Sequence, residues 1–511
     1  MRLFRVSLMV VFLAALLLLG AHGLWDVQAQ GPVYGGTLRV ALPAEPPGLD
    51  PTTNTAAVID RVVYNNVYEG LVKINRHGEI VPALAESLPE VSEDGLVWTF
   101  HLRRGVKFHD GHELTAADVV YTFERDMDPA TGVPHPEYYA PIESVEALDD
   151  YTVQFTLKEP NSMFLFNLAR GDSIIVPKGA GEELKSHPNG TGPFKFVEWV
   201  RGDHVTLERF EDYYGTDAEG NKLPYLDRVI IKFIPDPSAQ IAALKAGDID
   251  VIAYILSPES AVDIANDPRF KVLEGVTTGD VILAINNSRE PFNDVRVRRA
   301  ISYAINREEI IEGAMFGYGT PIGSHMSPIN PNYIDLTWVY PYDPEKAKEL
   351  LAEAGYPNGF HAVLKLPQPY NYSVRSGEIV AAQLKEVGID LDIQIIEWGQ
   401  WIDRVFLNAD YDLTIIGHAE AFDIGIYAKP DYYFRYDNPW LQEVIRRAER
   451  TVDPDEQKKL YAIAQWIIAS DAVNGFLFEA PSLPAMRKEV MGWWKDYPII
   501  ACDVTEVWIA K

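Results

Sequence analysis

Three histidines and one aspartate lie close together in DGLVWTFHLRRGVKFHDGHELTAADVVYTF, residues 94–123, and these residue types bind metal ions. His101 falls in a run of alternating apolar and polar residues, which is typical of a strand. His109 and His112, on either side of Asp110, are three positions apart in a polar turn rather than four apart on a helix. The spacing favours a solvated turn, and we expect neither a metal site nor a cofactor.

Motifs for enzymatic catalysis are not found in the sequence. It contains no G-x-S-x-G, no H-E-x-x-H and no P-loop. The glycines of FGYGTPIG, residues 316–323, follow a predicted helix rather than a strand, which disfavours a dinucleotide site. The single cysteine, Cys502, cannot form an intramolecular disulfide and is expected to be a buried structural residue. We expect a binding protein; a secreted hydrolase with two carboxylates in a cleft is the rival class.

The composition is that of a large, acidic globular protein. The 511 residues include 45 Lys and Arg against 74 Asp and Glu, which gives a net charge of −29. Phosphate binding needs a basic surface, so no nucleic-acid partner is expected. The length suggests two or three domains, and we expect a monomer.

The first thirty residues have the pattern of a secretory signal peptide. Arg2 and Arg5 precede a leucine-rich run to Leu19, and Val27 and Ala29 suit the positions before a cleavage site. We expect residues 1–29 to be removed and the mature chain to be exported, to the periplasm of a bacterium with two membranes. No cysteine lies near the cut, so no lipid anchor is expected. An uncleaved N-terminal anchor is the alternative.

Extended segments alternate with amphipathic helices along the rest of the chain. Runs rich in β-branched and aromatic residues predict strands at 36–42, 96–102, 151–157, 227–234 and 280–286. Capping residues predict helices that begin at Ser238, at Asp343 with Pro344, and at Asp453 with Pro454, and helix ends at Gly247, Gly355 and Gly388. Helix–glycine–strand units indicate mixed α/β domains, and the lack of a long linker suggests short crossovers between them.

The opening stretch itself predicts a strand, a turn and a helix. VWTFHLRRGVKF has the alternation of a hairpin-like pair of strands broken at Gly105, with Trp98 and Phe100 on one face. Thr115 precedes a helical pattern, and Asp118 follows three residues later, which is close to a capping box.

The segment ALAESLPEVSEDGLVWTFHLRRGVKFHDGHELTAADVVYTFER also resembles the signature region of the family 5 extracellular solute-binding proteins, the dipeptide-, oligopeptide- and nickel-binding components of ABC importers. Other segments resemble further landmarks in the family's order. They are YGGTLRVALPAEPPGLDP, GTGPFKFVEWVRGDHVTLERFEDYYG, YLDRVIIKFIPDPSAQIAALKAGDIDV, REPFNDVRVRRAISYAINREEII and DPEKAKELLAEAGYPNGF. The resemblance covers nearly all of residues 34–490.

The resemblance implies an α/β fold of the bilobed periplasmic-binding-protein type (Venus flytrap, type II or cluster C), with the ligand enclosed between the lobes. It implies lobe I at 30–276 plus 482–511, an extra subdomain at about 70–188, and lobe II at 277–481. The implied partners are a small-molecule or peptide ligand and the permease and ATPase subunits of an ABC importer. Peptides are the default ligand. A non-peptide solute of the same transporter family (an oligosaccharide, opine, metal chelate or glutathione-like compound) and a ligand-sensing receptor role are the alternatives.

A buried peptide needs an acid for its ammonium group and usually an arginine for its carboxylate. Peptide-binding relatives, as the resemblance suggests, carry a tryptophan and then an acid after a strand in lobe II. Here His418 occupies the tryptophan position, and the acid is shifted to Glu420 or Asp423. Dipeptide-type relatives carry an arginine before Pro-Tyr-Asn, where this chain has Gln368. Both anchors of a zwitterionic dipeptide are therefore altered.

The EW motif gives Trp398 as a wall of the ligand pocket, with ordinary core packing as the alternative. Arg375 and Arg435 are candidates to replace the missing arginine. The remaining ligand-binding candidates are Tyr370, Tyr432, Asn54 and Thr55. Solvation or helix capping is the alternative for the carboxylates, because loop acids usually serve those roles.

Overall fold

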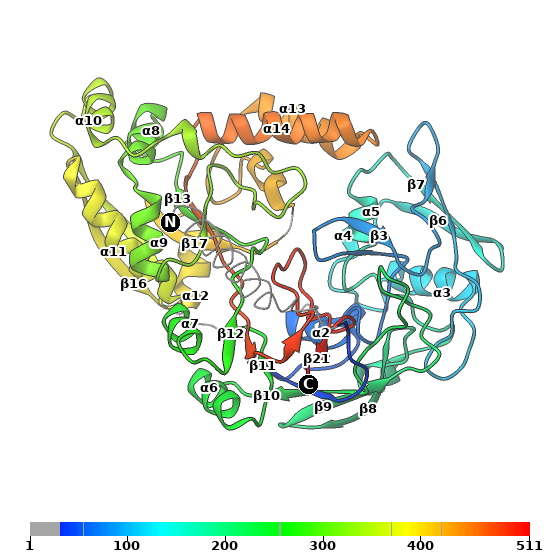
Figure 1. Cartoon of the computed structure of the whole chain (residues 1–511). Coiled ribbons are helices and arrows are strands. Elements are labelled where there is room, and N and C mark those ends of the chain that lie inside the picture. The colour runs from blue at the N-terminus through cyan, green and yellow to red at the C-terminus, as the bar shows by residue number, and fades with distance from the viewer. Residues whose placement is uncertain (1–30, 55, 255–256, 369, 421) are drawn as a thin grey trace, which may run out of the picture.

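The computed structural model describes residues 31–511, apart from residues 55, 255–256, 369 and 421. Two α/β lobes, each built on one large sheet, lie side by side (Figure 1). The predicted signal peptide, residues 1–29, lies outside the described residues, and so does Thr55. No described helix is both long and apolar enough to cross a lipid bilayer.

Lobe I is the part built on a mixed seven-stranded sheet. Its strands, in spatial order, are β12 (Phe270–Val272), β19 (Ala485–Arg487), β11 (Val251–Ile252), β1 (Thr37–Leu42), β10 (Arg228–Phe233), β9 (His204–Arg209) and β8 (Phe194–Val200). Its helices are α2 (Ala57–Val63), α6 (Pro237–Ala246) and α7 (Pro258–Ala265), and a short ladder joins β20 (Val490–Met491) to β21 (Trp508–Ile509). Cys502 is buried in this core as predicted, and burial raises the pKa of its thiol to about 12.

A smaller body, here called the subdomain, is built on a four-stranded sheet within the N-terminal half of the chain. Its strands, in spatial order, are β4 (Glu90–Val91), β5 (Val97–His101), β7 (Thr152–Leu157) and β6 (Ile142–Asp149). The accompanying elements are the hairpin β2 (Val72–Ile74) and β3 (Ile80–Pro82), and the helices α3 (Ala116–Met127), α4 (Pro136–Tyr139) and α5 (Phe164–Asn167).

The predicted pairing of two strands on either side of Gly105 is wrong. Strand β5 pairs with β4 and β7, and β7 begins about fifty residues later in the chain. Trp98 and Phe100 are nevertheless buried on one face, as the alternation predicts. The capping box is confirmed, because Asp118 Oδ2 accepts a hydrogen bond from Thr115 N at 2.9 Å.

Lobe II is the part built on a six-stranded sheet. Its strands, in spatial order, are β14 (Thr320–Pro321), β18 (Gly475–Glu479), β13 (Asp280–Ile285), β17 (Leu413–His418), β15 (Phe360–Pro367) and β16 (Ile389–Ile396). Its helices are α8 (Val295–Ala304), α9 (Arg307–Met315), α10 (Pro344–Glu353), α11 (Asn371–Glu386), α12 (Trp398–Trp401), α13 (Pro439–Arg450) and α14 (Pro454–Ser470). All six residues of β13 are buried, because helices cover both faces of this sheet.

Helix starts follow the sequence signals closely. Asp343 and Asp453 cap α10 and α14, and each accepts hydrogen bonds from backbone amides of the first turn, as predicted. The predicted N-cap Ser238 is wrong. Asp236 caps α6 instead and accepts from Ala239 N at 2.7 Å, because the helix begins two residues earlier, at Pro237.

Two short crossovers join the sheets of the lobes, one from β12 to β13 and one from β18 to β19. The crossovers pair with each other: Gly275 N donates to Ser482 O at 3.0 Å, and Ser482 N donates to Gly275 O at 2.8 Å. At the lobe II end, Asp280 and Glu479 are directly opposed in the ladder between β13 and β18. This two-stranded connection is called the hinge below.

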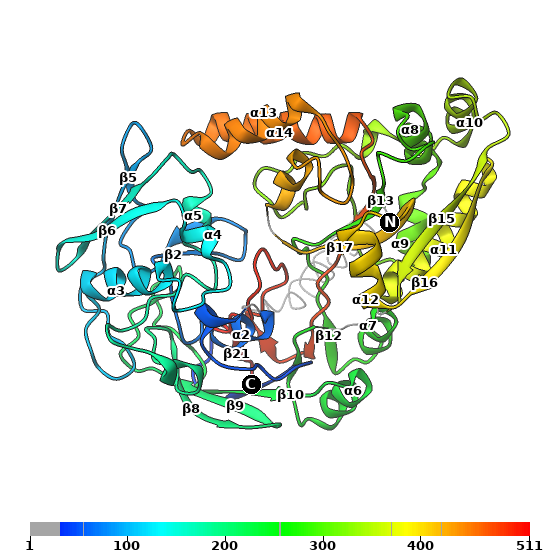
Figure 2. The same ribbon diagram turned by 180° about the vertical axis from the view of Figure 1, so that it is seen from behind.

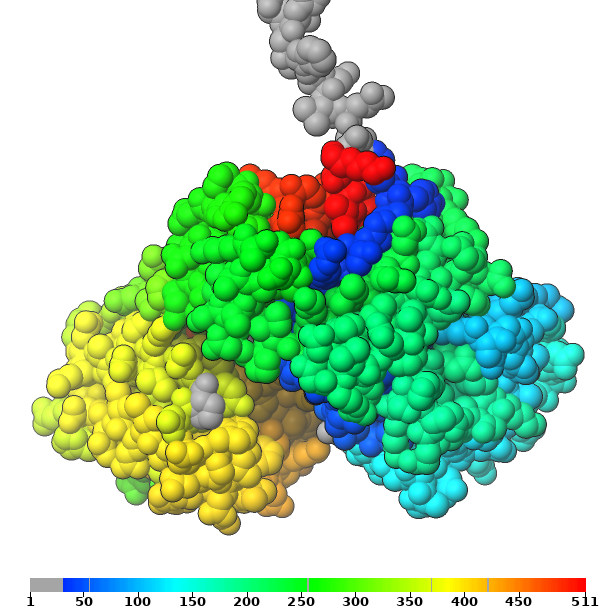
Figure 3. Space-filling view, turned by 90° about the horizontal axis from the view of Figure 1, so that it is seen from below, coloured from blue at the N-terminus to red at the C-terminus, as the bar shows by residue number. Residues whose placement is uncertain are grey.

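The lobes also touch far from the hinge. Helices α13 and α14 run along the side of lobe II and point toward the subdomain (Figure 2). Ser162 N donates to Glu449 O at 2.8 Å, and Arg450 Nη2 lies 2.7 Å from Glu159 Oε2. In the space-filling view, the surface is hollowed between the yellow and orange residues of lobe II and the blue and cyan residues of the N-terminal half (Figure 3). The cleft between the lobes is therefore bordered by the hinge and by these contacts.

Candidate ligand-binding cleft

An aromatic cavity of about 560 Å³ opens in lobe II beside the hinge. This volume is within the range of small-molecule sites in proteins. Gly279 and Ala480, one from each crossover, form the edge nearest the hinge. The aromatic wall consists of Tyr370, Tyr372, Trp398, Trp401, Phe406, Tyr432 and Tyr433. The predicted candidates Tyr370, Trp398 and Tyr432 therefore line one cavity together.

Trp398 presents a flat apolar surface to this cavity. Its ring stacks on Trp401 with centroids 5.0 Å apart and an interplanar angle of 7°, and it meets Tyr370 edge-on at 5.2 Å. Trp401 is buried, and its Nε1 donates to Thr414 Oγ1 at 2.9 Å, which fixes the lower ring of the stack. Trp398 remains 36% exposed, so one face of its ring is free to pack against a ligand.

His418 and Asp423 lie side by side at the back of the cavity, with a third partner that the sequence did not reveal. Asp423 Oδ1 is 2.8 Å from His325 Nε2, and Asp423 Oδ2 is 3.3 Å from His418 Nδ1. Two tyrosine hydroxyls complete the network, Tyr433 at 3.0 Å from His418 Nε2 and Tyr427 at 3.1 Å from His325 Nδ1. The carboxylate is thus held between two imidazoles.

The two histidines determine the charge of this group. Burial acts to raise the pKa of Asp423, but the two imidazoles more than offset it, so that pKa lies well below its usual range. Burial acts to lower the pKa of His325, yet the Asp423 carboxylate raises it overall. Burial lowers the pKa of His418. The charge of Asp423 is therefore compensated within the protein, and Asp423 is not a free anchor for a ligand ammonium.

Glu420 is the acidic candidate that is exposed at the edge of the cavity. Its side chain is 65% exposed and borders the aromatic cavity. It also borders two smaller cavities, and both of these are lined in part by Phe166 and Arg170 of the N-terminal half. Arg170 Nη1 lies 4.0 Å from Glu420 Oε2, and Phe422 meets Phe166 edge-on at 4.6 Å. Glu420 therefore stands where the two lobes face each other.

Four other candidates lie elsewhere among the described residues. Gln368 is exposed, and its backbone N donates to Ile396 O at 2.9 Å. Arg375 is paired with Glu259 of α7 at 2.9 Å. Asn54 Oδ1 accepts a hydrogen bond from Ala56 N, and Arg435 Nη1 donates one to Asp431 O.

The three histidines of the opening stretch have separate partners. His101 Nε2 is 3.8 Å from Glu90 Oε1, His109 Nε2 is 2.9 Å from Gly192 O, and His112 Nε2 is 3.3 Å from Asp118 Oδ1. Within the described residues, the group that brings three potential metal-ligating atoms within 4.8 Å of one another is that of His325, His418 and Asp423. These atoms already bond to one another, which is the geometry of an ion-pair network.

Comparison with known proteins gives a consistent picture. The family described as "Bacterial extracellular solute-binding proteins, family 5 Middle" matches residues 79–437. The chain is 32% identical to heme-binding protein A of Haemophilus influenzae (82% of this chain, 83% of that protein) and 30% identical to glutathione-binding protein GsiB of Pectobacterium atrosepticum (85% and 87%). It superposes on Helicobacter pylori DppA in complex with the peptide STSA with a TM-score of 0.72 and 30% identity, over 95% of this chain and 100% of that one. The chain belongs to the family 5 extracellular solute-binding proteins, which bind solutes for ABC transporters and are not enzymes.

Proposed function

We propose that this ABC transporter substrate-binding protein captures a short peptide in the cleft between its lobes and delivers it to a membrane permease driven by ATPase subunits. The observation that carries the proposal is the position of Glu420. It borders an aromatic cavity of about 560 Å³ and faces the opposite lobe across the cleft. A ligand held there would contact both lobes, which is the requirement for a ligand that stabilises the closed form.

The chemistry of the cavity favours a ligand with an ammonium group and an apolar side chain. Trp398 offers a large apolar surface, and aromatic surfaces of this kind contribute much of the energy at binding sites. Glu420 supplies the carboxylate that a ligand ammonium needs. Arg170, 4.0 Å from Glu420, is a cation on the other side that would meet a carboxylate of the same ligand. These roles were expected of an acid and an arginine, although Arg170 was not among the predicted residues.

The ligands named for two similar proteins support a peptide as the ligand. Helicobacter pylori DppA binds the peptide STSA, and GsiB is a binding protein for glutathione, itself a peptide derivative. Heme-binding protein A of Haemophilus influenzae marks the non-peptide alternative. The aromatic cavity suits an apolar side chain of a peptide, and the exposed carboxylate at its edge suits an amino terminus.

We further propose that residues 1–29 are a cleaved signal peptide and that the mature protein is periplasmic and monomeric. The proposed lobes are 30–276 with 482–511, which includes the subdomain at about 70–188, and 277–481. N-terminal sequencing of the exported protein tests the cleavage site: a first residue of Gln30 supports it, and a chain that begins at Met1 contradicts it.

Calorimetric titration of the purified protein tests the ligand class. The panel contains dipeptides and tripeptides with apolar side chains, their N-acetylated forms, glutathione and hemin. The proposal expects the free peptides to bind at least about tenfold more tightly than the acetylated ones, because a charged hydrogen bond to Glu420 is lost. Equal binding of both forms contradicts the role of Glu420. If hemin is the only compound of the panel that binds, the proposal of a peptide ligand is contradicted.

A further inference from the structure

A second cavity, of about 570 Å³, lies entirely within the N-terminal and C-terminal segments that build lobe I and the subdomain. Its walls come from the β2–β3 hairpin, the residue Arg103 after β5, the segment 213–216 and the C-terminal segment 503–506. It shares no lining residue with the cavities of the cleft described above. Nothing in the proposed transport function uses it.

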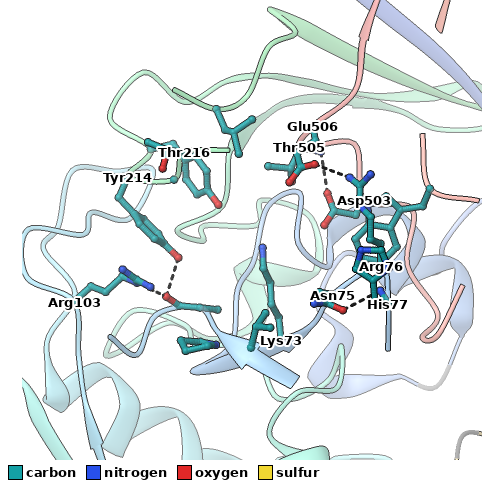
Figure 4. A pocket seen from close by; sticks show the side chains of 17 residues that line it. Lys73, Asn75, Arg76, His77, Arg103, Tyr214, Thr216, Asp503, Thr505 and Glu506 are labelled. Carbon is teal, nitrogen blue, oxygen red and sulfur yellow. Dashed lines mark hydrogen bonds and ion pairs between the residues drawn. The ribbon is translucent and has the colours of Figure 1, made fainter. Parts of the chain in front are cut away.

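The cations of this cavity outnumber its acids (Figure 4). Arg76 is paired, because its Nη2 lies 2.6 Å from Glu506 Oε2. Lys73 and Arg103 have no carboxylate within 4.0 Å among the residues that the structure describes. Figure 4 shows the ammonium end of Lys73 pointing into the middle of the cavity, away from the strand that carries it.

Arg103 is held in place by neutral groups. Its Nε donates to Ala83 O at 2.7 Å, and its guanidinium lies over the ring of Tyr214 with 5.5 Å to the centroid. The Tyr214 hydroxyl oxygen lies 3.1 Å from the same Ala83 carbonyl oxygen. These contacts orient the guanidinium at the cavity wall without neutralising its charge.

Two buried acids near the cavity are already engaged by hydrogen bonds. Glu69, behind the cavity wall, accepts hydrogen bonds from Thr191 at 3.0 Å and from Tyr213 and Tyr214 at 3.1 and 3.0 Å. Burial raises the pKa of Glu69, and the nearby Lys73 offsets this only in part. Asp503 is engaged by Thr505 N at 2.9 Å. Lys73 and Arg103 are thus two half-buried cations that line the same cavity without a carboxylate partner, an arrangement that an external anion would neutralise.

We propose that this cavity is a second ligand site, which binds a small organic anion through a carboxylate or phosphate group placed between Lys73 and Arg103. The volume exceeds what a bare ion needs. Trp494 and Leu223, both buried, supply apolar wall for the rest of the ligand. The site is independent of the cleft, so the protein would bind this anion and its transported solute at the same time.

Calorimetric titrations with citrate, inorganic phosphate and phenyl phosphate test the site at fixed ionic strength. We expect at least one of these anions to bind the wild type. Lys73→Met should weaken that binding at least about tenfold, because a charge-assisted hydrogen bond is lost. Lys73→Arg should restore it to within about threefold. Preference for citrate assigns a carboxylate ligand, and preference for a phosphate probe assigns a phosphorylated one.

Lys232→Met is the matched control, because Lys232 is half-buried in β10 of the same lobe and lies outside the cavity. It should bind the anion like the wild type, and so should Trp398→Ala in the cleft. NMR of the wild type with ¹³C-methylated lysines provides a measurement that needs no folded variant. The Lys73 resonance should shift on anion addition. The proposal is overturned if none of the three anions binds, if Lys73→Met binds like the wild type, or if the Lys73 resonance does not move.

Discussion

Asp423 and His325, which are 98 residues apart in the chain, meet at the back of the cleft with 2.8 Å between Oδ1 and Nε2. His325 is buried, and its contact with Asp423 engages a carboxylate that the sequence suggested as an anchor for a ligand ammonium. The pairing changes the electrostatics of the cleft, because it leaves Glu420 as the exposed acid at the edge of the aromatic cavity.

Removing the charge of Asp423 should destabilise the protein. Asp423→Asn leaves two histidines without their carboxylate, and we expect a loss of about 3 kcal/mol in the free energy of unfolding. Urea unfolding measures this loss, with Asp431→Asn, at a fully exposed position, as the control.

The effect should depend on pH. Asp423 has a lowered pKa, so its contribution to stability exists above about pH 4 and is lost as the pH falls. His325 has a raised pKa, so its contribution exists below about pH 6.5 and is lost as the pH rises. The difference between variant and wild type should therefore be largest between these two values, and a pH-independent difference would contradict the pairing.

The hinge should lose stability as the pH rises. Burial raises the pKa of Asp280 to about 8 and that of Glu479 to about 9, and both lie where the crossovers enter lobe II. A buried carboxyl group with a raised pKa stabilises the folded state fully below its unfolded pKa of about 4, and this contribution is lost as the pH rises through the folded value. Asp280→Asn should therefore gain stability relative to the wild type between about pH 4 and 8, by at most about 1.4 kcal/mol per pH unit.

Thermal unfolding at pH 5, 7 and 9 measures this gain. The melting temperature of Asp280→Asn should exceed that of the wild type most at pH 9. A variant that melts below the wild type at pH 9 would show that the charged carboxylate has a partner, contrary to the unbonded Oδ1 seen in the structure.

Much of the local structure could be predicted from the sequence, because strands and helix caps depend on neighbouring residues. The Asp-Pro pairs at Asp343 and Asp453 illustrate this, and the same signal at Asp236 would have corrected the wrong N-cap at Ser238. The partner of β5 could not be predicted, because an alternating pattern specifies a buried face but not the strand beside it.

The cleft was predictable only in part, for a similar reason. Trp398 and His418 belong to motifs that are local in sequence, and both line the aromatic cavity. The spacing of Trp398 and Trp401 fits one turn of helix, so the stacked pair had a sequence signal that was missed. His325 had none: it lies in the loop GSHMSPIN, and only the tertiary fold brings it to Asp423.

Arg375 should contribute little to ligand binding, although it was a candidate to replace the missing arginine. Its guanidinium forms an ion pair with Glu259 of α7. The side chain of Arg375 is 34% exposed and that of Glu259 is 40% exposed. Arg375→Met should change ligand affinity less than about threefold, since exposed ion pairs contribute little. Calorimetry with the peptide that binds most tightly checks this. A tenfold loss would mean that Arg375 leaves Glu259 and contacts the ligand.

Glu420 should matter far more than other exposed acids. Glu420→Gln keeps the shape of the side chain and removes its charge, so we expect peptide affinity to fall about tenfold or more with no change in melting temperature. Glu308→Gln is the matched control, because Glu308 is exposed on α9 and lies away from the cavity. If both variants bind peptide equally well, the ammonium group is held by another residue.

Native mass spectrometry of the protein purified without denaturant tests whether the aromatic cavity holds a peptide. We expect the wild-type protein to carry co-purifying peptide masses and Trp398→Ala, which removes the free face of the tryptophan stack, to lose them. Trp440→Ala, which removes a tryptophan that is 62% exposed on α13, should retain them. A single non-peptide mass, or peptide masses retained equally by both variants, would contradict a peptide held in the aromatic cavity.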